Sequence, residues 1–284
     1  MPMRDTDSRL IQCATRLKLS WTRDHLLELI NTVTDAKMTP REVLDYCFSK
    51  EIEQREENRI KLANMAAHFP PGNFTLEQFD MTAQPSLDPG IIRELETMEW
   101  AKAGENVLFL GPPGVGKTHL AIGLAKRAIG MGMSARFYTA ETLLAILEKA
   151  QKEGILAEKI NEINKFKVIV IDEVGYLSYP ATAGHLMFQL VSKRYQNKSI
   201  IVTGNRPPGE WGLIFGDSTA ASAILDRLLH HSTTVTIRGD SYRIMELKKR
   251  NAKRKLPKSS KLPPAPASSA ERPPRPHNSS CGTV

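Results

Sequence analysis

A glycine-rich octapeptide at residues 111–118 holds the residue types that bind phosphate. Its sequence is Gly111-Pro112-Pro113-Gly114-Val115-Gly116-Lys117-Thr118. It follows a short apolar run and precedes a segment with helical spacing. In that setting, glycines let successive backbone N–H groups point at phosphates near the positive end of the helix. We expect Lys117 to reach the β- and γ-phosphates of a nucleotide and the Thr118 hydroxyl to ligate Mg²⁺.

Two adjacent carboxylates, Asp172 and Glu173, end another apolar run, at residues 168–171. A carboxylate at the carboxyl end of a buried parallel strand lies where ligands of open α/β sheets collect. We expect Asp172 to be a Mg²⁺ partner, directly or through the ion's other ligands. Glu173 is placed to orient and polarise a water for attack on the γ-phosphate. A solvated turn is the alternative, and the phosphate loop upstream favours the chemical interpretation.

Two further polar residues stand where strands and helices end. Asn205 follows the apolar run 199–203, and it could hydrogen-bond the attacking water or the γ-phosphate, or simply form a turn. Arg227 ends an apolar helical segment. It could pair with Asp226 or cap the helix, or it could be an arginine finger that reaches a neighbouring subunit's nucleotide. The adjacent His230 and His231 point about 100° apart on a helix, which favours a structural role over a shared metal.

These residues need a sheet to position them, and five apolar runs rich in β-branched residues supply it. The runs are residues 106–110, 135–139, 168–171, 199–203 and 233–237. Helical patterns separate them. Near-continuous apolar strands that alternate with helices indicate a parallel sheet covered on both faces. The sequence therefore predicts a three-layer α/β domain.

The regions flanking this domain have different compositions. Residues 1–68 are predicted to form a small helical module, with a capping box at Thr39-Pro40-Arg41-Glu42 opening one helix and residues 26–33 forming a second that could pack against it. We interpret the polar segment 53–59 as a solvated extension of the first helix. Another helix is expected over 89–103. The tail at 248–284 is basic and rich in Pro and Ser, and we expect it to be disordered.

Composition excludes several classes of protein. The 284 residues are 41% hydrophobic and 25% charged, as in globular proteins. The net charge of +8 belongs to the tail, because residues 248–284 hold ten Lys/Arg and one acid while residues 1–247 hold 29 and 30. Three widely spaced cysteines predict neither a disulfide framework nor a zinc ribbon. With no secretory or membrane-spanning pattern, we expect a cytoplasmic protein without a membrane partner.

Over residues 8–247 the chain resembles the IstB-type transposition helpers, which are AAA+ ATPases of bacterial insertion sequences related to the DnaC helicase loaders. The resemblance rests on the motifs GPPGVGKTHLAIGLA (111–125), IDEVGYLSY (171–179), FQLVSKRY (188–195), TGNRPPGEWGLIFGD (203–217), AILDRLLHH (223–231) and IRGDSYR (237–243). The motifs GEWGLIFGD and LDRLLHH are far more specific than the phosphate loop. The tail is not part of the pattern.

This resemblance implies an AAA+ P-loop NTPase domain at 69–247, with the Asn205 strand between those of Lys117 and Asp172. It makes Asn205 the sensor residue, Arg227 a finger acting in trans, and Arg243 a candidate second sensor. It also implies a homo-oligomer that forms with ATP on duplex DNA and stimulates or targets a partner transposase. Residues 141–165 correspond to a helical insertion of the initiator and loader group, on which Lys149, Lys152 and Lys159 are candidate DNA contacts.

Other functions remain open at this stage. A replicative helicase loader would use the same ATPase, although GEWGLIFGD and LDRLLHH favour the transposition branch. A non-hydrolysing, nucleotide-gated adaptor would not need the acidic pair and the strand-end Asn. A small-molecule P-loop kinase fits the helix-end Arg less well than an oligomeric ATPase does.

Overall fold

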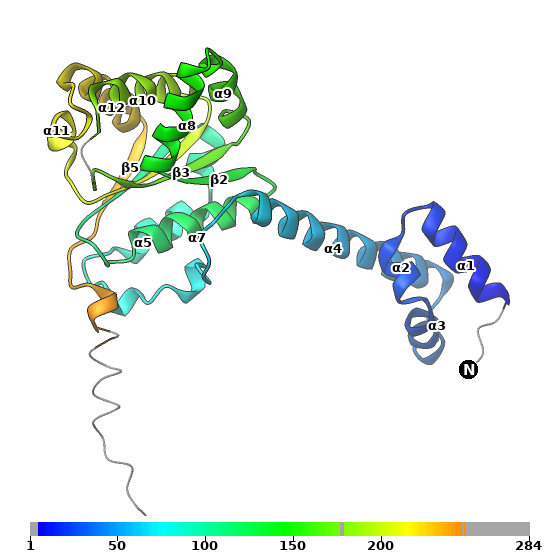
Figure 1. The fold of residues 1–284 in the computed structure, drawn as a ribbon. Coiled ribbons are helices and arrows are strands. Elements are labelled where there is room, and N and C mark those ends of the chain that lie inside the picture. The colour runs from blue at the N-terminus through cyan, green and yellow to red at the C-terminus, as the bar shows by residue number, and fades with distance from the viewer. Residues whose placement is uncertain (1–4, 177–178, 246, 248–284) are drawn as a thin grey trace, which may run out of the picture. The chain divides into compact units, whose positions relative to one another are not determined.

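The predicted strands all form, and they pair into one parallel sheet in the computed structural model, which describes residues 5–176, 179–245 and 247. The strands are β1 (Asn106–Leu110), β2 (Ala135–Thr139), β3 (Val168–Val174), β4 (Ser199–Gly204) and β5 (Ser232–Thr236). Their spatial order is β2-β3-β4-β1-β5. Figure 1 shows the sheet among its helices, with β2, β3 and β5 labelled. The expected position of the Asn205 strand, β4, between β1 and β3 is therefore confirmed. The main difference is in β3, which runs three residues further than predicted.

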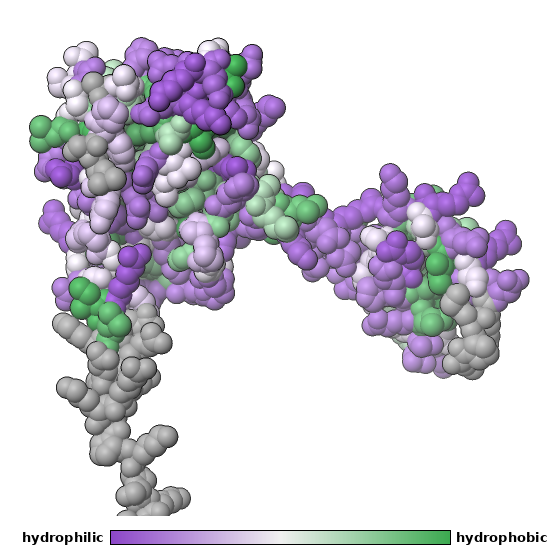
Figure 2. All heavy atoms as spheres, viewed as in Figure 1, coloured by the Kyte–Doolittle hydropathy of each residue, from purple (hydrophilic) through white to green (hydrophobic). Residues whose placement is uncertain are grey.

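Helices cover both faces of this sheet, and alternate strand residues point to opposite cores. Leu108 and Ile169 pack with α8 to α12, whereas Phe109 and Val170 pack with α5 to α7. Burying each such side chain contributes roughly 1.5–3 kcal/mol. Hydrophilic side chains gather on the visible surface around α8 and α9 (Figure 2). The helices are α5 (Pro89–Glu96), α6 (Glu99–Ala103), α7 (Lys117–Gly130), α8 (Ala140–Lys152), α9 (Leu156–Ile163), α10 (Ala181–Arg194), α11 (Trp211–Phe215) and α12 (Ser218–His230).

The prediction of a single helix over 89–103 is wrong, because the chain forms two helices there. Met98 adopts a left-handed conformation with φ 61° between α5 and α6. Its side chain is fully buried, and the nearby Trp100 indole N–H donates to the Leu95 carbonyl at 2.9 Å. The break lets both large side chains enter the core, and this tertiary packing overrides the local helical pattern.

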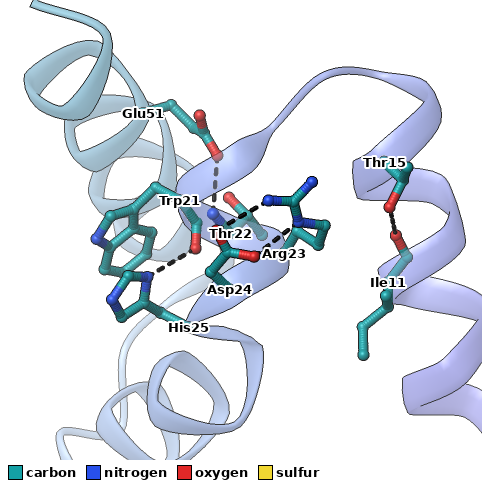
Figure 3. Close-up of polar contacts among 8 residues, drawn as sticks. All are labelled: Ile11, Thr15, Trp21, Thr22, Arg23, Asp24, His25 and Glu51. Atoms are coloured by element: carbon teal, nitrogen blue, oxygen red, sulfur yellow. Dashed lines mark hydrogen bonds and ion pairs between the residues drawn. The ribbon is translucent and has the colours of Figure 1, made fainter. Parts of the chain in front are cut away.

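The N-terminal helices are α1 (Asp5–Arg16), α2 (Ser20–Asp24), α3 (Leu26–Asp35) and α4 (Pro40–Ala66). The predicted capping box forms, since the Thr39 hydroxyl accepts from the Glu42 N–H and the Glu42 carboxylate accepts from the Thr39 N–H. The sequence indicates that residues 26–33, which lie in α3, could pack against α4. The short α2 instead makes the main contact of these helices with α4. The Glu51 carboxylate of α4 accepts from the Thr22 N–H of α2 at 2.8 Å (Figure 3).

The end of α4 packs on the α/β domain. Arg59 donates to the Ile129 carbonyl at 3.0 Å, and Arg136 of β2 donates to the Ala66 carbonyl at 2.7 Å. The polar segment 53–59 is thus solvated only in part. The division at residues 68 and 69 stays a prediction.

A connecting segment then reaches the start of α7. It contains the 3-10 turns η1 (Leu76–Gln78) and η2 (Met81–Ala83), and a third turn, η3 (Pro208–Glu210), precedes α11. The tail predicted to be disordered, 248–284, lies outside the described residues. Within the described part of the chain, no helix has both the length and the apolar character required to cross a membrane.

Candidate nucleotide-binding site

The phosphate loop connects β1 to α7 through left-handed glycines. Gly114 has φ 83° and Gly116 has φ 98°, a region that side chains with a Cβ rarely adopt. Space is also short, because a Cβ on Gly116 would meet the Phe79 ring and one on Gly114 would meet Ser241. These positions therefore require glycine for both conformation and close approach.

Lys117 begins α7 and turns back over the loop. Its ammonium group donates to the carbonyl oxygens of Gly111 and Pro112, both at 2.8 Å. Burial lowers the pKa of Lys117, Asp172 opposes this shift, and Arg243 adds to it. The cation is thus held inside the loop, where the sequence predicts the β- and γ-phosphates.

Asp172 lies buried at the end of β3. Its carboxylate accepts from the Thr118 hydroxyl at 2.9 and 3.1 Å and also from the Thr203 hydroxyl. Burial raises the pKa of Asp172, while the bonds from Thr203 and Thr118 act in the opposite direction. The structure thus brings together the two residues predicted to hold Mg²⁺.

The strand pairing is interrupted at Glu173. The register between β3 and β4 shifts between Ile171 and Val174, as in a β-bulge, and Glu173 has a left-handed φ of 63°. Its side chain is exposed and lines the same cavity as Lys117. Strained backbone of this kind concentrates at functional sites. One buried and one exposed carboxylate result from adjacent positions.

Thr203 is a site residue that sequence reasoning missed. It is fully buried on β4, opposite the bulge, and its hydroxyl contacts both halves of the acidic pair. A polar residue inside the apolar run 199–203 was the available signal. Its partners could not be known without the bulge.

A cavity of about 490 Å³ joins these groups. Its lining includes Lys117, Thr118, both carboxylates and Arg243, so the structure brings the candidate second sensor to the phosphate loop. The Tyr242 N–H donates to the Gly114 carbonyl at 2.9 Å, which holds this segment in place.

The other wall of the cavity is aromatic, and no periodic pattern in the sequence indicates it. Phe74 and Phe79 line it from the connecting segment. His119 packs edge-on against both rings, with its ring centroid 5.5 Å from each of theirs. Its Nε2 lies 2.7 Å from the Thr75 carbonyl oxygen, which holds the ring in place. An apolar, flat-sided wall beside a phosphate loop suits a nucleobase.

Two of the predicted catalytic residues, Asn205 and Arg227, lie outside this lining. Asn205 is exposed after β4, beside the turn at Gly175. Arg227 lies on α12 with its guanidinium 4.6 Å from the Phe188 ring centre, and it donates to the Ala223 carbonyl at 3.1 Å. Among the described contacts it forms no ion pair with Asp226.

The candidate DNA-contacting lysines lie on the two helices after β2. Lys149 is 3.9 Å from Glu153, and Lys159 is 2.6 Å from Glu162. Lys152 is exposed. Two of the three lysines thus lie beside a carboxylate three or four residues further along the chain.

The donors present fit a nucleotide with Mg²⁺. The left-handed glycines and the enclosed Lys117 suit a polyphosphate, and the cavity is large enough for an attached nucleoside. The Thr118 hydroxyl and the Asp172 carboxylate are the hard oxygen ligands that Mg²⁺ prefers.

A parallel sheet in this order, with a phosphate loop after β1 and an acidic pair at the end of β3, is the AAA+ P-loop fold. Residues 12–252 match the profile of the IstB-like ATP binding protein family, and the chain belongs to that family. ATP binding is the property that names it.

Two known proteins that are similar to this chain are also named as ATP-binding proteins. It is 40% identical over 239 residues to an ATP-binding protein of insertion sequence IS21 from Pseudomonas aeruginosa, covering 83% of this chain and 88% of the relative. It is 46% identical over 196 residues to one of IS5376 from Geobacillus stearothermophilus, covering 69% and 76%.

Among solved structures, the replication initiator DnaA bound to AMPPCP and single-stranded DNA aligns with TM-score 0.52 and 21% identity. The alignment covers 68% of this chain and 58% of DnaA. This likeness supports the fold.

Proposed function

We propose that the protein is an Mg²⁺-dependent ATPase that assembles on duplex DNA and stimulates or targets the transposase encoded with it. The observation that carries the proposal is the convergence of Lys117, Thr118, Asp172 and Glu173 on one cavity. Kinship with insertion-sequence proteins over most of the chain supports the setting. In this proposal the protein acts in the cytoplasm, where bacterial DNA lies.

Five residues of the cavity lining have roles in hydrolysis in this proposal, and Asn205 outside the lining has a sixth. Lys117 stabilises the negative charge that develops on the β- and γ-phosphates, and Arg243 adds a second cation. Thr118 and Asp172 would hold Mg²⁺, which would supply charge neutralisation when bound. Glu173 is exposed to the cavity and can accept a hydrogen bond from the attacking water. Asn205, beside the turn at Gly175, helps to sense or position that water.

Arg227 requires a second copy of the chain to act. It lies on α12 and is not among the described residues that line its own cavity. Its guanidinium is partly exposed and free of a carboxylate partner in the described contacts, which suits a finger offered to a neighbour. ATP would then join two subunits, and hydrolysis would release them.

A helicase loader is the main competing function. The sequence relatives described above are proteins of insertion sequences, which favours transposition. Affinity capture from cells that contain both partners separates the two. Recovery of the transposase supports the proposal, and recovery of the replicative helicase instead contradicts it.

The decisive experiment measures ATP hydrolysis and particle mass together, with and without duplex DNA. We expect DNA to increase turnover and ATP to increase the mass. Arg227→Ala should reduce both effects, whereas Arg93→Ala, which removes an exposed arginine from α5, should reduce neither. A protein that stays monomeric with ATP and hydrolyses ATP at the same rate with and without DNA would contradict the proposal.

A further inference from the structure

The lysines that form ion pairs in the described structure each pair with a glutamate close by in the sequence. Lys50, Lys102, Lys149 and Lys159 each do so at a spacing of three or four residues. Such pairs leave little net charge for a polyanion. Lys149 and Lys159 of the α8–α9 region are therefore weak candidates for DNA contacts.

A different group of cations has no such partner. Lys165 and Lys167 lie just before β3, Lys198 lies just before β4, and Arg194 ends α10 beside them. We call these four residues the basic edge. They lie at the amino ends of the strands, and the nucleotide site lies at the carboxyl ends. No carboxylate of the described chain forms an ion pair with any of them.

Electrostatics shows how these charges affect one another. Burial lowers the pKa of Lys198, and Arg194 and Lys167 lower it further. Lys167 is affected in the same way, by burial first and by Arg194 second. The Lys159 ammonium already binds Glu162 at 2.6 Å and is the main cause that lowers the pKa of this carboxyl, with Lys165 adding a smaller effect. The positive charges thus reinforce one another.

The basic edge is also ordered in advance. Lys167 donates to the carbonyl oxygens of Lys102 and Asn197, each at 3.2 Å, and Lys198 donates to that of Lys165 at 3.2 Å. An ammonium group has three N–H donors. Lys167 therefore keeps one donor free and Lys198 keeps two. Side chains that are already held lose less conformational freedom when they bind.

Arg194 supplies positive charge to the basic edge from the interior of the domain. It is fully buried, and its guanidinium donates only to oxygen atoms of uncharged groups, including the carbonyls of Phe166, Lys167 and Ser199. Burial lowers its pKa to about 9, so it remains a cation at neutral pH.

We propose that the basic edge binds the phosphate backbone of duplex DNA. This inference deepens the proposed function and rests on it. Free N–H donors and unpaired positive charge are the features that phosphate contacts use. The aromatic residues beside the edge are engaged elsewhere, because Phe166 packs against the core and Tyr195 stacks on His230. A platform for stacking single-stranded bases is therefore not offered there.

The test is the salt dependence of DNA binding by the full chain. The probe is a fluorescently labelled random-sequence duplex, with a non-hydrolysable ATP analogue present and salt varied from about 50 to 200 mM. The test variant is Lys165→Gln/Lys198→Gln. The matched control, Lys149→Gln/Lys159→Gln, removes the same charge from the α8–α9 region, and every variant keeps the basic tail.

We expect the test variant to flatten the plot of log affinity against log salt by about two units, one for each lost phosphate contact. The control should keep the wild-type slope. Lys165→Gln alone, at an exposed side chain, should remove about one unit, which covers the case in which the double variant fails to fold.

Three results would overturn the inference. A test variant with the wild-type slope, or a control with the greater loss, would move the contact elsewhere. Unchanged DNA binding with lost capture of the transposase would make the edge a protein-binding surface. If the wild-type protein binds no duplex, the proposed function fails together with this inference, whereas the first two results leave that function intact.

Discussion

The hydroxyl of Thr203 donates a hydrogen bond to the buried carboxylate of Asp172. The same oxygen accepts from the backbone N–H of Glu173 at 3.0 Å. One side chain on β4 therefore fixes both the proposed Mg²⁺ partner and the backbone turn that exposes the proposed base. Thr203 is a positioning residue, because it lies outside the cavity lining and acts through its neighbours.

Replacing Thr203 with Val should reduce hydrolysis more than nucleotide binding. The change keeps the shape but leaves the Glu173 N–H without its acceptor and removes one bond from Asp172. We expect the rate of hydrolysis to fall by about ten- to a hundredfold and the unfolding free energy by about 1–3 kcal/mol. Steady-state kinetics and denaturant unfolding measure the two effects.

Thr203→Ser is the matched control because it restores the hydroxyl. It should recover most of the activity. If Thr203→Val hydrolyses ATP at the wild-type rate, the hydroxyl does not position the acidic pair.

Much of the fold follows from the sequence because the strands are short apolar runs bounded by turns. Four of the five predicted strands agree with the observed bounds to within one residue. The sheet order came from the family resemblance, since strand spacing alone does not fix it. The break at Met98 could not be predicted, because it depends on which side chains the finished core can bury.

The site was predictable where local sequence determines geometry. The phosphate loop and the acidic pair are contiguous motifs, so Lys117, Thr118 and Asp172 converge as expected. Thr203 and the aromatic wall depend on contacts between distant segments. The bulge opposite Thr203 and the packing of Phe79 on Gly116 appear only when those segments meet.

Glu173→Gln should bind ATP and DNA but lose turnover. The amide keeps the size and the exposed position, but it cannot polarise a water as a carboxylate does. General-base contributions suggest a loss of about 10²–10⁴-fold in the hydrolysis rate. Single-turnover phosphate release measures it, with nucleotide affinity determined in parallel. Hydrolysis at the wild-type rate would show that another group is the base.

Arg194→Lys should destabilise the protein without changing the nucleotide site. The buried guanidinium bonds the loops before β3 and β4, and an ammonium has fewer donors in a different geometry. Carbonyl oxygens left without a hydrogen-bond donor and a buried charge with fewer hydrogen bonds cost about 3 kcal/mol of unfolding free energy. Urea unfolding tests this, with the exposed neighbour change Lys193→Met as a control expected to stay within about 0.5 kcal/mol. Equal stability of the two variants would contradict the stated role.

Glu51 allows the N-terminal helices to be tested separately. Its side chain is 3% exposed; one carboxylate oxygen accepts from the Thr22 N–H, and the other is buried without a partner in the described contacts (Figure 3). Glu51→Gln retains the acceptor and removes a charge that is costly to bury. It should therefore be as stable as the wild type or more so, whereas Glu51→Ala should lose about 1–3 kcal/mol. Hydrogen exchange of the α2 amides reads out this contact directly: faster exchange in Ala but not in Gln is expected, and faster exchange in both would mean that the negative charge itself holds α2 on α4.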